Sequence, residues 1–198
     1  MSAQFDLFRD AQAGDRPIVP GFALVREVIS ARAEAELDAQ IDSAPLAPFR
    51  FGQWTGKRLT CSYGSGYDFQ RGALLDAPPL PGWLLDLRGR LAPLVGVEPA
   101  AAGQALLIRY DPGAGIGWHR DRPQYGKVLG LSLGAPVTLR LRRRTADGFE
   151  RRSVLLPPRS LYFLSGEVRR EWEHSIAPIG QTRRSITFRT LEAPGGGV

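Results

Sequence analysis

Histidine and cysteine are scarce in this chain of 198 residues, and both scarcities limit its chemistry. Cys61 is the only cysteine, so an internal disulfide is excluded, and a small buried thiol is its expected role. No apolar run approaches the roughly 18 residues of a membrane span, and the amino terminus lacks a hydrophobic secretory segment. We therefore expect a cytoplasmic protein with no membrane partner.

The two histidines lie in the segments Gly117–Asp121 and Trp172–Ile176. On an extended segment, side chains two residues apart point the same way, about 7 Å along the strand, so His119 and Asp121 can converge on one ion. His174 must reach that ion from elsewhere in the fold. Two imidazoles and one carboxylate form the facial triad of non-haem Fe(II) oxygenases. The alternative is a surface imidazole beside a solvated carboxylate, because a His-x-Asp pair is a weak motif.

The chain carries a formal net charge of +6, which suits a polyanionic partner. Lys57 and Lys127 are the only lysines, so arginine supplies nearly all of the positive charge. A bias in the base composition of the source genome would also produce many arginines. The positions of the arginines are therefore more informative than their number.

The pattern of apolar residues predicts two helices near the start of the chain. Ser30 is a suitable cap for a helix through about Asp42. A second helix is expected from Pro81, because leucines recur at helical spacing, and Pro93 should bend or shorten it. Residues 1–20 are polar and irregular and are expected to form a flexible segment.

From Ala105 onward the chain consists of short β-rich runs separated by glycine, proline and Asp-Gly breaks. These runs are 105–110, 128–133, 136–142, 150–156, 160–164, 173–177 and 183–191. Many short strands after two helices predict an α+β protein, and we expect one domain over residues 1–198. Its β part should be a jelly roll, a double-sheet roll closed around an interior site.

The last predicted strand alternates in character. Arg183, Ser185, Thr187 and Arg189 share one face, opposite to Ile186 and Phe188. If the apolar face packs beneath a helix, the polar row faces the interior, where buried guanidinium groups need anionic partners. A dicarboxylate cosubstrate would supply them. The alternative is an edge strand with solvated arginines.

Five motifs together resemble the AlkB family of Fe(II)- and 2-oxoglutarate-dependent dioxygenases. They are Arg109-Tyr110-Asp111-Pro112-Gly113, Gly117-Trp118-His119-Arg120-Asp121, Leu131-Ser132-Leu133-Gly134, Leu164-Ser165-Gly166-Glu167 with Trp172-x-His174, and the pair Arg183 and Arg189. The resemblance covers most of the chain. It implies a double-stranded β-helix core behind N-terminal helices and, over residues 49–70, a lid that recognises the nucleotide.

The resemblance also implies roles for individual residues. His119, Asp121 and His174 would be catalytic and would bind Fe(II). Arg183 would hold the far carboxylate of 2-oxoglutarate with its planar fork of donors. The remaining cosubstrate contacts would come from Tyr110, Ser185 and Arg189. With O2, such a centre hydroxylates an alkyl group on a ring nitrogen, and the product releases an aldehyde and restores the base.

Substrate contacts are expected mainly in the lid. Trp54, Tyr63 and Tyr67 are candidates for stacking on a base, with Tyr63 favoured because its Tyr-Gly pair resembles the family's lid. Arg58 and Arg120 are the expected basic contacts. The aromatic rings have an alternative role, since each could pack a hairpin against the roll.

A basic hairpin and an N-terminal peptide provide two further candidate contacts. The hairpin carries arginines that could bind phosphates, although a solvated strand face explains the same pattern; they are Arg140, Arg142, Arg143, Arg144, Arg151 and Arg152. Residues Gln4–Phe8 resemble the peptide with which DNA-maintenance proteins bind the replicative sliding clamp, or they fold back on the domain. We expect a monomer that acts on DNA or RNA with alkylated bases.

Two positions differ from the repair members of the family. Those members usually carry asparagine where this chain has Ile108, and often an acidic residue where it has Pro123. The segment Ser165–His174 also resembles a branch that hydroxylates a modified tRNA wobble uridine. The alternatives are therefore a tRNA-modifying or protein hydroxylase, and, from different classes, a noncatalytic jelly-roll binding domain or a zinc hydrolase.

Overall fold

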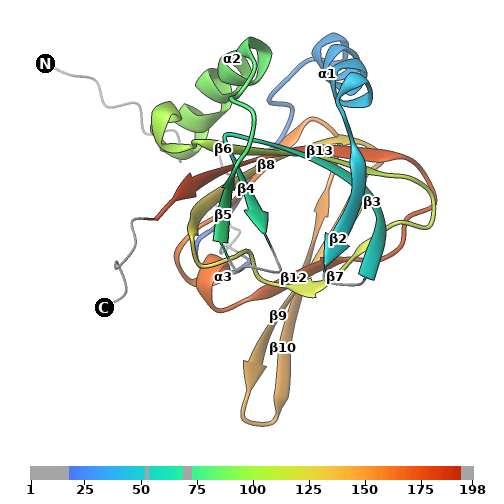
Figure 1. The fold of residues 1–198 in the computed structure, drawn as a ribbon. Helices are drawn as coiled ribbons and strands as arrows, with labels where there is room; N and C mark the ends of the chain where they lie inside the picture. Colours follow the sequence, from blue (N-terminus) through green and yellow to red (C-terminus); the bar gives the residue numbers. More distant parts are fainter. Residues whose placement is uncertain (1–17, 52–53, 69–72, 193–198) are drawn as a thin grey trace, which may run out of the picture.

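The computed structural model describes residues 18–51, 54–68 and 73–192, and its core is a roll of two antiparallel sheets (Figure 1). The larger sheet has seven strands in the order β1-β11-β8-β13-β6-β3-β2, and the smaller has four in the order β10-β9-β12-β7. The larger sheet contains β1 (Phe22–Val25), β2 (Ala47–Phe51), β3 (Trp54–Tyr63), β6 (Gln104–Tyr110), β8 (Tyr125–Gly134), β11 (Ser160–Leu164) and β13 (Arg183–Leu191). The smaller contains β7 (Ile116–His119), β9 (Val137–Thr145), β10 (Gly148–Leu156) and β12 (Glu173–Ile176), and a separate pair is formed by β4 (Ser65–Asp68) and β5 (Ala73–Asp76).

Two helices cover the outer face of the larger sheet (Figure 1). In α1 (Ala31–Ser43), the hydroxyl of Ser30 caps the first turn by accepting a hydrogen bond from the backbone N–H of Ala33, as the sequence predicts. Helix α2 (Gly82–Leu91) continues into the 3₁₀ turn η1 (Ala92–Val95), so Pro93 does shorten the regular helix. A second 3₁₀ turn, η2 (Pro99–Ala101), leads into β6.

Strand β13 lies in the middle of the larger sheet, between β8 and β6, and its alternation is as expected. Ile186 and Phe188 are fully buried in the core cluster beneath α1 and α2, together with Ile41 and Leu84. The opposite, polar face of β13 is also buried and points into the roll. This parity creates a polar interior, and the edge-strand alternative is wrong.

Each predicted β-rich run corresponds to an observed strand, and the expected double-sheet roll is confirmed. The sequence reasoning missed β1, β2, β3, β4, β5 and β7, and also the short helix α3 (Gly166–Arg170). Among the described residues, no helix combines the length and apolar character that crossing a membrane requires. Residues Gln4–Phe8 lie outside the described residues, so the sliding-clamp contact stays a prediction.

Candidate active site

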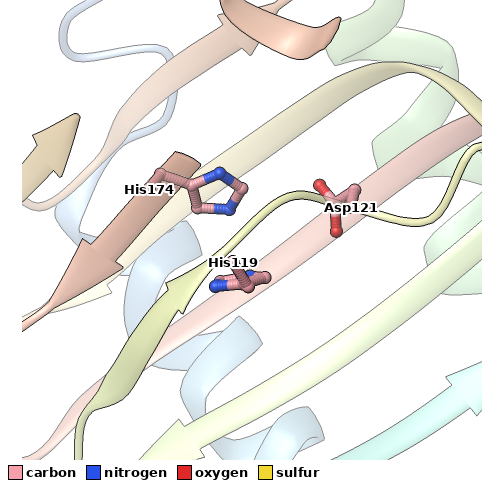
Figure 2. A group of neighbouring side chains, drawn as sticks. All are labelled: His119, Asp121 and His174. Atoms are coloured by element: carbon pink, nitrogen blue, oxygen red, sulfur yellow. The ribbon is translucent and has the colours of Figure 1, made fainter. Parts of the chain in front are cut away.

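His119, Asp121 and His174 form a compact cluster inside the roll (Figure 2). One potential ligand atom from each residue lies within 4.8 Å of the others. His119 ends β7, Asp121 follows it in the chain, and His174 lies on β12, where its Cα pairs with that of His119. The antiparallel pairing of β7 with β12 therefore brings together two histidines that are 55 residues apart in the sequence.

Glycine at position 115 permits the close approach of these two strands. A Cβ atom at Gly115 would lie 2.8 Å from the carbonyl oxygen of Ile176, which is backbone and cannot move aside easily. The Cα atoms of Ile116 and Ile176 are also paired, with a shift in register between His174 and Ile176. Any larger residue at Gly115 would push β7 away from β12 and separate the two histidines.

Hydrogen bonding and burial prepare the imidazoles for a metal. The Nδ1 atom of His119 lies 2.9 Å from the carbonyl oxygen of Gly117; if Nδ1 carries the proton, it donates this bond and Nε2 is free to bind an ion. Burial lowers the pKa of His119, and burial together with the nearby His119 lowers the pKa of His174 to about 3. Both rings are therefore neutral near pH 7, and neutral imidazole is the form that binds metal.

Asp121 is held in its charged form by Arg189. Burial alone would raise the pKa of Asp121, but the charge of Arg189, joined by the two imidazoles when acid protonates them, outweighs it, and the pKa lies well below its usual value. One guanidinium nitrogen of Arg189 lies 3.1 Å from Oδ1 of Asp121, and another donates to Oε1 of Gln104 at 3.0 Å. The sequence reasoning missed Gln104, a buried residue that orients Arg189.

Arg183 is 1% exposed and has no carboxylate partner in the part of the chain that the structure describes. The only hydrogen bond of its guanidinium there runs to the hydroxyl of Ser132 at 3.3 Å, and its Cζ atom lies 5.3 Å from the ring centre of Tyr110. Its Nε atom is buried without a partner. Because an isolated buried charge is costly, this guanidinium fits a carboxylate of a ligand.

A cavity of about 1030 Å³ joins these groups. Its lining includes all three residues of the cluster, together with Arg183 and Arg189, and both sheets contribute to it. The predicted cosubstrate contacts Tyr110 and Ser185 also line it, and both are at most 2% exposed. The donor set suits Fe(II), and the partnerless Arg183 suits the far carboxylate of 2-oxoglutarate.

Only some of the residues expected to bind substrate line the cavity. Arg58 and Arg120 line the cavity, whereas Tyr63 does not. Strand parity turns Tyr63 to the other face of β3, where it packs against the core cluster beneath the helices, so its expected place beside the base is wrong. Trp54 and Tyr67 belong to β3 and β4, but their side chains lie outside the described residues.

Arg169 is a structural contact that the sequence reasoning missed. It lies on α3, is 8% exposed, and donates hydrogen bonds to the carbonyl oxygens of Arg122 and Tyr125. Those carbonyls belong to the turn that follows Asp121. Arg169 thus ties α3, which precedes His174, to the segment that carries the carboxylate of the cluster.

The basic hairpin β9–β10 projects from the roll (Figure 1), and many of its charges are paired internally. Arg143 contacts Glu150, Glu167 and Glu171, while Arg142 binds Glu173 at 2.6 Å. Arg152 pairs with Glu150. Three of its arginines have no carboxylate partner within the described ranges: Arg140, Arg144 and Arg151. The surface open to phosphates is therefore smaller than the sequence indicates.

Comparisons with known proteins agree with this site. The family model described as 2OG-Fe(II) oxygenase superfamily matches residues 48–190. Alpha-ketoglutarate-dependent dioxygenase AlkB of Salmonella typhimurium is 26% identical over an alignment of 211 residues that covers 93% of this chain and 96% of the relative. The tRNA (carboxymethyluridine(34)-5-O)-methyltransferase ALKBH8 of Mus musculus is 25% identical over 191 residues, covering 93% of this chain.

Other relatives match in part or in fold. Uncharacterized protein L905 of Acanthamoeba polyphaga mimivirus is 33% identical over 101 residues, or 44% of this chain. The chain spans 48% of the length of the viral protein and 28% of that of the mouse protein. The solved structure of OsALKBH1 has the same fold, with a TM-score of 0.64 at 14% identity over 89% of this chain and 98% of that one. The chain therefore belongs to the 2OG-Fe(II) oxygenase superfamily and, within it, to the AlkB family.

Proposed function

We propose that this enzyme oxidatively removes alkyl groups from nucleobases in DNA or RNA, using Fe(II), 2-oxoglutarate and O2. In this proposal His119, Asp121 and His174 hold the iron. When bound, iron and 2-oxoglutarate supply the two-electron oxidation of a C–H bond, with succinate and carbon dioxide as coproducts. Hydroxylation of an N-alkyl group gives an unstable product that loses an aldehyde, which leaves the base and the backbone intact.

The chain's own residues would bind and orient the reactants. Arg183 would grip the far carboxylate of 2-oxoglutarate through charge-assisted hydrogen bonds, and Tyr110 and Ser185 would line that pocket. Arg189, held by Gln104, would keep Asp121 ionised and correctly oriented. The single observation that carries the proposal is the shared cavity, which contains a metal-binding cluster and a buried arginine without a carboxylate partner.

Positive charge around the cavity supports a nucleic-acid substrate. Arg50, Arg120 and Arg170 line the cavity and are exposed, whereas Asp121 and Glu173 are the acidic residues of its described lining. Such a distribution attracts a phosphate backbone to the entrance. A base inside a duplex would have to leave the stack to reach the iron, at a cost of a few kcal/mol that is smallest for damaged or single-stranded sites.

We further propose that the chain forms a single domain and that residues 49–70 act as its lid.

Formaldehyde release is the direct test of this function. The purified enzyme with Fe(II), 2-oxoglutarate and ascorbate would be incubated with single-stranded DNA and RNA oligonucleotides that carry N-methylated bases. Mass spectrometry should show loss of the methyl group, and formaldehyde should appear in equal amount. Intact methylated bases across the whole panel, while 2-oxoglutarate is still converted to succinate, would contradict the proposal.

A second candidate is hydroxylation of a modified tRNA base. It is favoured by the match to the mouse tRNA methyltransferase, which covers nearly the whole of this chain. The two functions differ in product, because hydroxylation at a carbon that is not attached to nitrogen gives a stable alcohol. A tRNA product that is heavier by one oxygen atom, without formaldehyde, would favour this second function.

A further inference from the structure

Arg58 is a second guanidinium of the cavity without a carboxylate partner. It lies on β3, half-buried, and lines the same cavity as the metal-binding cluster. Its Nε atom is fully buried and has no hydrogen-bond partner. No ion pair involves Arg58 within residues 18–51, 54–68 and 73–192. Its guanidinium therefore has no carboxylate within ion-pair distance among the described residues.

The surroundings of Arg58 orient it without neutralising it. Its Cζ atom lies 3.8 Å from the ring centre of Phe49, which also lines the cavity. A cation over an aromatic face gains some stabilisation, but the ring carries no net charge. Burial lowers the pKa of Arg58, because loss of solvent disfavours the charged form. The Phe49 ring thus holds the guanidinium in place for a partner that supplies negative charge.

Both carboxylates of 2-oxoglutarate already have partners in the proposed function. Arg183 takes the far carboxylate, and the near carboxylate belongs at the iron, beside Arg189. Arg58 comes from a different strand, on the β3 side of Tyr110, whereas Arg183 lies on β13 on its other side. Arg58 nevertheless lines the same cavity as Asp121, whose negative charge is part of its electrostatic surroundings. The substrate that remains to supply an anion to Arg58 is therefore the nucleotide.

We propose that Arg58, stacked on Phe49, binds an anionic oxygen group of the nucleotide and thereby places its base at the iron. This inference rests on the proposed function and adds to it a requirement for negative charge close to the target carbon. Two parts of a nucleotide offer this chemistry: a phosphate that flanks the target base, or a carboxylate on the base itself. A planar guanidinium can bind either through two parallel hydrogen bonds.

The test is a thermodynamic cycle in which a charge is removed from the protein, from the ligand, and from both, and the binding affinities are compared. Binding of labelled single-stranded oligonucleotides would be measured by fluorescence anisotropy at fixed salt, under nitrogen, with the enzyme loaded with Fe(II) and 2-oxoglutarate. One pair of probes has a carboxymethyl or a neutral carbamoylmethyl group on a uracil. The other pair has a phosphodiester or a neutral methylphosphonate beside an N-methylated base. The proteins compared are the wild type, Arg58→Gln and the matched control Lys57→Gln, whose side chain is exposed and lines no part of the cavity.

Arg58→Gln should weaken binding of the anionic member of one pair by roughly 10- to 100-fold and leave its neutral counterpart nearly unaffected. Lys57→Gln should reduce both members of each pair equally, because an exposed charge outside the cavity contributes only general attraction to the backbone. The pair that shows the selective loss identifies the source of the anion. Arg58→Lys should restore part of the binding.

An equal effect of Arg58→Gln on charged and neutral probes in both pairs would overturn the inference, as would failure of the wild type to bind any probe. The visible band of the Fe(II)–2-oxoglutarate chelate, present in Arg58→Gln as in the wild type, checks that the variant folds and loads. Formaldehyde release from methylated oligonucleotides tests the proposed function separately. If formaldehyde is released but Arg58→Gln shows no selective loss of binding in either probe pair, the proposed role of Arg58 is refuted and the proposed function is not.

Discussion

His119 and His174 lie directly opposite each other on the antiparallel strands β7 and β12, with ring centres 4.2 Å apart. Two histidines placed so closely in a buried site would repel each other if both were protonated. A shift of one residue in the pairing would turn His174 to the opposite face of the strand. The register of these two strands is thus the feature on which the metal-binding cluster depends.

Replacing His174 with alanine should abolish turnover, because it removes one of three proposed ligands. The loss of iron affinity should exceed the roughly 10- to 100-fold that loss of an outer-shell partner costs. Titration with Fe(II) under nitrogen measures the affinity directly. Iron binding by the His174→Ala variant as tight as that of the wild type would remove His174 from the ligand set.

Arg183→Ala should chiefly raise the concentration of 2-oxoglutarate that the enzyme needs. Removing a charge-assisted grip should increase the KM for 2-oxoglutarate roughly 10- to 100-fold, while kcat at saturating cosubstrate changes less. Arg183→Lys should recover part of the loss, because it keeps the charge but not the planar fork. An unaltered KM in both variants, measured by succinate formation, would show that the far carboxylate binds elsewhere.

Gly130 provides space for the ring of Tyr162, and this relationship predicts a stability defect. A Cβ atom at Gly130 would lie 2.0 Å from Cζ of Tyr162, which projects from the neighbouring strand and lines the cavity. Gly130→Ala should therefore destabilise the fold by about 1–3 kcal/mol, measured by denaturant unfolding. Combined with Tyr162→Leu, the same substitution should cost much less than alone. Additive effects would mean that the ring moves aside freely.

The ion pair between Arg184 and Asp42 predicts how stability depends on pH. A guanidinium nitrogen of Arg184 lies 2.5 Å from Oδ2 of Asp42, and this hydrogen bond lowers the pKa of Asp42 below its ordinary value. The folded pKa is below the unfolded one, so the stabilisation is complete above the unfolded pKa and disappears as the pH falls through the folded pKa. Asp42→Asn should thus lower the Tm near pH 7 and have little effect once the pH lies below the folded pKa.

Asp38, which also contacts Arg184, is expected to affect stability in the opposite direction to Asp42. Burial raises the pKa of the neighbouring Asp38, although Asp38 also contacts Arg184. The contribution of Asp38 to the pH dependence of stability therefore has the opposite sign to that of Asp42. A Tm difference between the wild type and Asp42→Asn that grows on acidification would contradict the assigned direction.

The C-terminal half of the fold could be predicted from sequence because its strands alternate clearly. The buried row on β13 followed from strand parity and the cost of burying two guanidinium groups unpaired, taken together with the metal-binding motif. The four-residue strands β1, β4 and β7 were missed because so short a run carries little periodicity, and no clear apolar alternation marked them in the sequence. Their pairing partners stabilise them, and those partners are remote in the sequence.

In the site, too, residues within local sequence motifs could be predicted, whereas residues that act through partners remote in the sequence could not. Local motifs identified His119, Asp121 and His174, whereas Gln104 and Ser132 were missed because their importance depends on Arg189 and Arg183. The choice of Tyr63 failed because a Tyr-Gly pair does not reveal which face of its strand meets the cavity. That face became known only through the pairing of β3 with β6.

Anaerobic addition of Fe(II) and 2-oxoglutarate to the purified protein tests the central claim most directly. If His119, Asp121 and His174 hold iron beside a pocket in which Arg183 grips the keto acid, a visible charge-transfer band of the chelate will appear. The same addition to His174→Ala should give no band. Absence of the band in correctly folded wild-type protein would contradict the account.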